Sequence, residues 1–129
     1  MISVDTNVLV RLLTNDDPVQ AHRAARIMEK ENIFIPKTVL LETEWVLRHA
    51  YKIERPNILT AFQTLLGLPS VSMETSQTVV LALSFYAEGL DFADALHLAS
   101  SKSADAFATF DKNLLKKADI VSSLRLIQP

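Results

Sequence analysis

Short apolar runs alternate with longer amphipathic segments along the whole chain. Brief β-branched runs between turn residues are typical of buried strands, whereas apolar residues that recur every three or four positions indicate helices. The predicted strands are 2–4, 33–35, 71–73, 106–109 and 124–127. The predicted helices are 8–13, 18–30, 38–51, 56–67, 75–87, 91–103 and 111–117. Strands that alternate with helices predict an α/β fold with a parallel sheet.

Individual residues support the ends of these elements. Thr38 is placed to cap the third helix, and Gly89 is placed as the C-terminal stop of the fifth. The third helix carries more apolar surface, including Trp45 and Tyr51, than one core face requires. We interpret the surplus as the surface of a homodimer.

Composition narrows the class of protein. The chain has 129 residues, of which 49% are hydrophobic and 22% charged, so we expect a single globular domain over residues 1–129. Thirteen Lys and Arg stand against fifteen Asp and Glu, so the net charge of −2 gives no reason to infer a nucleic-acid partner. The absence of cysteine excludes disulfides, a thiolate nucleophile and a Cys-based zinc site. With no signal pattern or membrane-length apolar run, the expectation is a soluble cytoplasmic protein without a membrane partner.

Acidic residues occur where strands end and helices begin. Asp5 follows the first strand directly, and Glu42 lies about one turn into the helix after the second. Asp91 and Asp94 occupy the first turn of the helix before the fourth strand, and Asp111 follows that strand. In an α/β unit, helix starts lie at the carboxyl edge of the sheet, where ligands usually bind. The sequence therefore predicts carboxylates from four segments at one edge.

Each acid also has a local interpretation. Asp5 and Asp111 are natural N-caps, and Asp91 with the acid three residues later resembles a capping box. Glu44 pairs with Arg48 by spacing, as an ordinary surface ion pair would. Taken singly, these interpretations are at least as good as a functional one, but capping does not require the helix starts to meet.

Convergent carboxylates would require a counter-ion. Two charges about 4 Å apart at an effective dielectric of about 20 interact with about 4 kcal/mol. Oxygen ligands without cysteine suit a hard ion such as Mg²⁺ or Mn²⁺. Such an ion can activate water and neutralise a phosphate together. The pattern therefore indicates metal-assisted phosphodiester hydrolysis.

Four short motifs also carry a family resemblance. They are VDTNVL at 4–9, LLE at 40–42, DFADA at 91–95 and TFD at 109–111. Together they resemble the acidic motifs of PIN-domain ribonucleases, and their order and the chain length most resemble the VapC toxins of toxin–antitoxin pairs. The resemblance implies a three-layer α/β/α sandwich with a five-stranded parallel sheet. It also implies RNA cleavage with Mg²⁺ or Mn²⁺, a homodimer, and inhibition by a small antitoxin.

The same resemblance assigns roles to residues. Asp5, Glu42 and Asp94 would bind the metal, with Asp111 as the fourth catalytic acid. Thr6, Asn7, Asp91 and Thr109 would orient ligands and waters around them. Many relatives place another acid shortly after the fourth, and this chain does not, which leaves one metal or two open. Lys37, Lys112 and Arg11 are candidates for RNA backbone contacts, although a solvated cation is the simpler interpretation of each.

Other functions fit the sequence less well. A haloacid-dehalogenase-type phosphatase needs a second acid two residues after the first, where this chain has Asn7. A phosphoacceptor receiver domain has a pair of acids near its N-terminus, which is absent here. A PIN fold that serves only as an inactive binding scaffold remains the alternative from a different class, although all four acids are present.

Overall fold

The structure is a computed structural model and describes residues 1–121 and 124–129. It divides into two compact units, Met1–Ser76 and Gln77–Pro129, and each unit is described by itself. Within the described residues, no helix has the length and apolar character to cross a membrane. The expectation of a single domain over the whole chain stays a prediction.

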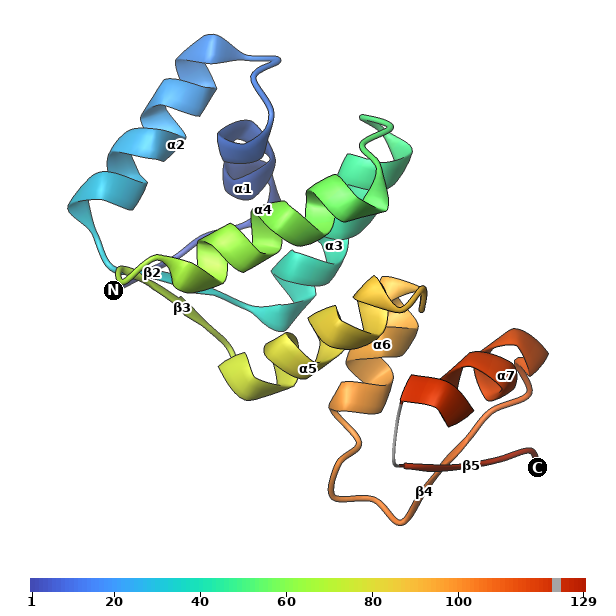
Figure 1. The fold of residues 1–129 in the computed structure, drawn as a ribbon. Coiled ribbons are helices and arrows are strands. Elements are labelled where there is room, and N and C mark those ends of the chain that lie inside the picture. The colour runs from blue at the N-terminus through green and yellow to red at the C-terminus, as the bar shows by residue number, and fades with distance from the viewer. Residues whose placement is uncertain (122–123) are drawn as a thin grey trace. The chain divides into compact units, whose positions relative to one another are not determined.

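The first unit combines a parallel sheet with four helices. Its elements are β1 (Ile2–Ser3), α1 (Thr6–Leu13), α2 (Pro18–Lys30), β2 (Ile33–Ile35), α3 (Lys37–His49), α4 (Arg55–Gly67) and β3 (Val71–Met73). The three strands are hydrogen-bonded in the order β1–β2–β3 and run parallel. Helices α1 and α2 pack against each other (Figure 1). The first and last residues of these elements agree with the predicted ranges to within two residues.

The core of the first unit comes from the residues that the apolar pattern places inward. Ile33 and Ile35 of β2 are almost fully buried, as are Leu9 of α1 and Phe62 of α4. Burying side chains of this size contributes about 1.5–3 kcal/mol each. The alternation along β2 and the helical spacing elsewhere therefore explain why these segments adopt their respective structures.

The first strand differs from its prediction as a buried strand. Strand β1 lies at an edge of its sheet, and Ile2 is 36% exposed. Val4, just beyond the strand, is buried, and its N–H still donates to the carbonyl of Phe34 at 3.2 Å. The prediction of burial over residues 2–4 was thus right for Val4 and wrong for the two residues of β1, which are exposed.

Two predictions about α3 were also wrong in part. The helix begins at Lys37, so Thr38 is not its cap; instead the Glu74 carboxylate accepts a hydrogen bond from the Lys37 N–H at 2.9 Å. Glu44 pairs with Arg48 at 2.7 Å, as the spacing predicted, but Glu44 is 1% exposed and the pair is not a surface one. Spacing within a helix fixes which residues meet, whereas burial depends on what packs over them.

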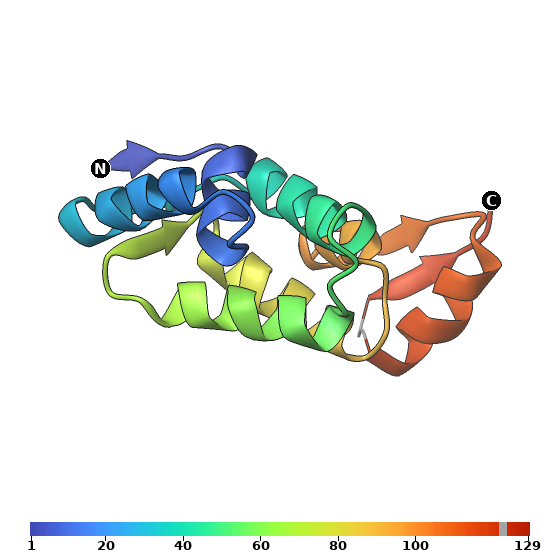
Figure 2. The ribbon, with the colours of Figure 1, turned by 90° about the horizontal axis from the view of Figure 1, so that it is seen from above.

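In its described residues, the second unit contains three helices and a pair of strands. Its elements are α5 (Ser76–Ala87), whose first residue closes the first unit, α6 (Phe92–Ala99), β4 (Ala106–Ala108), α7 (Lys112–Val121) and β5 (Arg125–Ile127). Strands β4 and β5 are parallel, and α7 packs alongside them (Figure 2). Gly89 has a positive φ of 105° just after α5, which confirms it as the stop residue of that helix. Helix α6 ends at Ala99, several residues earlier than predicted.

The expected five-stranded sheet is corrected by the strand pairing. Among the described residues, the strands form a three-stranded and a two-stranded parallel sheet. Strand β1 has only two residues, and its ladder partner is β2. The α/β class and the parallel direction were predicted correctly, since the helical crossovers dictate both.

Candidate active site

Asp5 connects the first strand to the first helix. Its backbone is extended, and its Oδ1 accepts a hydrogen bond from the Val8 N–H at 3.3 Å, so it is the N-cap of α1. The side chain is exposed. The local capping interpretation is therefore correct for Asp5, but it occupies only one of the two carboxylate oxygens.

Thr6 links Asp5 to the second acid of this unit. Thr6 is 8% exposed, and its hydroxyl donates a hydrogen bond to Oε1 of Glu42, which lies on an exposed position of α3. A hydrogen bond to an ionised group is stronger than one between neutral groups. Thr6 thus fixes the direction of the Glu42 carboxylate, and its expected role in orienting metal ligands stays a prediction.

A third acid of the first unit was missed by the sequence analysis. Glu74 follows β3 as Asp5 follows β1, and its carboxylate caps α3 from outside that helix through the Lys37 N–H. The signal was available, because an acid directly after a strand had been used to select the other candidates. Its hydrogen bond gives Glu74 a structural role at the start of the helix that carries Glu42.

Asp91 and Asp94 are brought together at the start of α6. Asp91 is the N-cap, and its Oδ2 accepts hydrogen bonds from the N–H groups of Ala93 at 3.1 Å and Asp94 at 3.4 Å. Burial raises the pKa of the half-buried Asp94 carboxyl, and the negative charges of Asp91 and Asp111 raise this pKa further. His97, one turn along the helix, acts in the opposite direction. Asp91 and Asp111 are therefore both close enough to act on the Asp94 carboxyl.

Asp111 resembles Asp5 in its local structure. Its Oδ1 accepts hydrogen bonds from the N–H groups of Asn113 at 2.9 Å and Leu114 at 3.1 Å, and it thereby caps α7. The hydroxyl of Thr109 accepts a hydrogen bond from the Asp111 N–H at 3.0 Å. Thr109 thus holds the backbone of the acid, and its expected role in orienting ligands and waters stays a prediction.

Carboxylate oxygens remain open at four of these side chains. Among the described residues, Oδ2 of Asp5, Oε2 of Glu42 and Oδ2 of Asp111 accept no hydrogen bond. Neither oxygen of Asp94 accepts one from a described residue. At Asp5 and Asp111, helix capping and metal binding are thus compatible, because each cap uses only one of the two carboxylate oxygens.

The four acids expected to bind the metal divide equally between the two units. Asp5 and Glu42 lie in the first, and Asp94 and Asp111 in the second. No group of three or more Asp, Glu or His side chains in the described part of the chain has the arrangement of a metal site. The oxygen-only donors present, and the repulsion around Asp94, fit a hard divalent cation in their chemistry.

The three residues expected to contact RNA differ in whether their charged groups already pair with described residues of the protein. The Arg11 guanidinium forms an ion pair with Asp16 at 3.1 Å and donates to Gln20 at 2.7 Å and to the Tyr51 hydroxyl at 3.1 Å. Lys37 is half-buried and Lys112 is exposed, and no described residue pairs with either ammonium group. The RNA contacts stay predictions, with the two lysines better placed than Arg11 to accept a phosphate.

Comparison with known families gives one match over most of the chain. The family described as PIN domain matches residues 2–120, which include both units' acids. A comparison with curated proteins gives no match.

Proposed function

The chain belongs to the PIN domain family, and from that membership we propose that it is a metal-dependent endoribonuclease. PIN domains are generally nucleases. In the proposal, Asp5, Glu42 and Asp94 would hold Mg²⁺ or Mn²⁺, and Asp111 would be the fourth acid, binding a second ion or a metal-bound water. The observation that carries it is that these four side chains keep carboxylate oxygens open among the described residues, while helix-start hydrogen bonds fix Asp5 and Asp111 and the Thr6 hydroxyl fixes Glu42.

The proposal requires the acids of the two units to meet. Asp5 follows β1, and Asp111 follows β4. The family match runs through both units.

Each residue then has a defined task. The divalent ion supplies an activated water and neutralises charge on the scissile phosphate. Thr6 turns Glu42 toward its ligand position, and Thr109 holds the backbone of Asp111. The pKa of Asp94 is raised by burial and by its acidic neighbours, and a cation held there would offset that repulsion.

The test compares two acids with the same local structure. Asp5→Asn keeps an N-cap oxygen but removes the charge, and we expect it to lower Mg²⁺-dependent RNA cleavage by at least about 100-fold. Asp17 caps α2 through Gln20 N–H at 3.1 Å in the same way, so Asp17→Asn is the matched control and should retain activity. Full cleavage by a folded Asp5→Asn variant would remove the proposed centre. RNA binding without cleavage by the unmodified chain would instead identify the inactive scaffold.

The biological setting is a further part of the proposal. The motif order supports a toxin of the VapC type, inhibited by a small antitoxin, and a cytoplasmic location. A small DNA-binding reading frame beside this one, whose product abolishes RNA cleavage on mixing, would support that role, and a product without effect on cleavage would contradict it.

Homodimerisation has a candidate surface on α3. Trp45 is 56% exposed, and its ring lies 4.7 Å from that of His49. An exposed tryptophan of this kind is typical of interfaces. Tyr51, by contrast, is held within its own unit by Asp16, to which its hydroxyl donates at 2.6 Å. Light scattering of the purified chain measures the mass that decides between monomer and dimer.

A further inference from the structure

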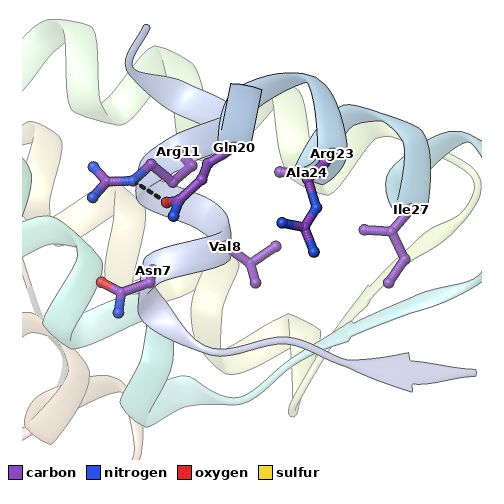
Figure 3. Close-up of a pocket in the computed structure, with 7 residues that line it drawn as sticks. All are labelled: Asn7, Val8, Arg11, Gln20, Arg23, Ala24 and Ile27. Atoms are coloured by element: carbon purple, nitrogen blue, oxygen red, sulfur yellow. Dashed lines mark hydrogen bonds between the residues drawn. The ribbon is translucent and has the colours of Figure 1, made fainter. Parts of the chain in front are cut away.

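A basic surface lies along α2, beside a groove that the proposed metal site does not use. The groove has a volume of about 330 Å³ and is lined by Asn7, Val8 and Arg11 of α1 and by Gln20, Arg23 and Ile27 of α2, with Ala24 between them (Figure 3). A second hollow of about 320 Å³ shares Arg23 and Ile27 with it. That hollow adds Ile2, Arg26, Lys30 and Glu31. The two hollows therefore adjoin along one side of α2.

Three cations occupy this side of the helix. Arg23, Arg26 and Lys30, which we call the α2 basic face, are spaced by three and four residues and so share one side of α2. All three are exposed, and in the described part of the chain none of their side chains makes a hydrogen bond or an ion pair. Even Glu29, three residues after Arg26, forms no ion pair with it there. Their charges are therefore available to a ligand.

The chemistry of the groove suits an anionic polymer. Its four polar lining residues all carry hydrogen-bond donors, and none is a carboxylate. The chain as a whole has a net charge of −2, so a face with three unpaired cations is a local feature and does not reflect general basicity. Apolar side chains such as Val8 and Ile27 offer contact to riboses and base faces. Single-stranded nucleic acids are bound by this combination of positive charge and non-polar surface.

The position of the groove indicates that the anionic polymer is RNA. Asn7, which lines one part of it, lies two residues after Asp5, so the groove opens beside the strand end that carries the first acid. We propose that the RNA strand on one side of the cleaved bond runs through this groove and the adjoining hollow, with its phosphates against the α2 basic face. This inference rests on the proposed ribonuclease function. An acidic protein segment would also complement the charges, but nothing would then connect the groove to the neighbouring acid.

The test measures binding separately from cleavage. In an Asp5→Asn background, affinity for a fluorescein-labelled 12-nucleotide oligouridine is measured by anisotropy in EDTA at several salt concentrations. The variant R23Q/R26Q/K30Q is compared with K52Q/K102Q/R125Q, which changes the net charge equally at exposed positions elsewhere. A third variant, R23K/R26K/K30R, keeps the charges. Circular dichroism and thermal melting verify that each variant is folded.

The salt dependence gives a quantitative expectation. Each phosphate contact to a single strand contributes about −0.7 to the slope of log K against log salt, so loss of three contacts should flatten the slope by about 2. The charge-matched control and the charge-keeping variant should retain the original slope within about 0.7, one contact. Equal slopes for R23Q/R26Q/K30Q and its control overturn the inference, as does an absence of RNA binding. Charge-dependent binding of an amphipathic Glu/Leu helical peptide, with RNA affinity unchanged, overturns it in favour of a protein partner. If the unmodified chain binds RNA but does not cleave it, the proposed function is contradicted. The binding comparison between the variants still decides whether RNA lies along α2.

Discussion

The hydrogen bond between Thr6 and Glu42 gives the sharpest test of how the site is held. Thr6→Val preserves the shape of a buried side chain and removes only the hydroxyl donor, whereas Thr6→Ser keeps the hydroxyl. A hydrogen bond to a charged group contributes about 1.5–3 kcal/mol. Because Glu42 is exposed, water replaces the lost donor in part, and the expected loss of unfolding free energy is about 1 kcal/mol. For a chain of this size that corresponds to about 3–5 °C in Tm.

The catalytic effect should exceed the effect on stability. Removing a partner that orients a metal ligand typically lowers metal affinity or activity by about 10–100-fold. The assay is RNA cleavage as a function of Mg²⁺ concentration at fixed RNA. Thr6→Val should raise the Mg²⁺ concentration for half-maximal rate by about tenfold or more, and Thr6→Ser by less than about threefold. A folded Thr6→Val variant with the Mg²⁺ dependence of the unmodified chain would refute the orienting role.

Two further predictions concern stability. The raised pKa of Asp94 means that the folded state holds its proton more tightly than the unfolded chain, so unfolding free energy falls as the pH rises from about 3.9 through the folded pKa. Asp94→Asn should therefore melt higher than the unmodified chain at pH 7 in EDTA and equally at about pH 3, and a lower melting temperature at pH 7 would contradict this electrostatic account. Gly89→Ala places a side chain at φ 105° and should cost about 1 kcal/mol or more in urea unfolding. Gly67→Ala, with nothing within 4 Å of the added carbon and no positive φ, is the control, and an equal loss there would contradict the backbone explanation.

The local sequence pattern was sufficient to predict the helices and strands but not to predict which strands pair. Every predicted helix and strand has a counterpart, because apolar periodicity and turn residues act within a few positions of the chain. Strand pairing depends on contacts between distant segments. The short β1 ladder and the separate β4–β5 sheet could not be read from residue types.

The same division between local and distant information applies to the site. That Asp5 and Asp111 would cap helices was predictable, since a cap involves only the next three residues. The cap of α3 by Glu74 was not, because its carboxylate comes from 37 positions away. Burial of Glu44 escaped prediction for the same reason, since it depends on what covers the helix.

The helix caps have a consequence for the size of ion that the proposed site would accept. Asp5 and Asp111 each use one oxygen for backbone N–H groups, which leaves each with one oxygen that accepts no hydrogen bond from a described residue and favours single-oxygen coordination. Calcium usually fills six to eight positions and often takes both oxygens of a carboxylate, whereas magnesium is satisfied by six ligands, several of them water. Monodentate donors at helix starts would thus discriminate against the larger ion, and calcium would compete poorly for a site built in this way.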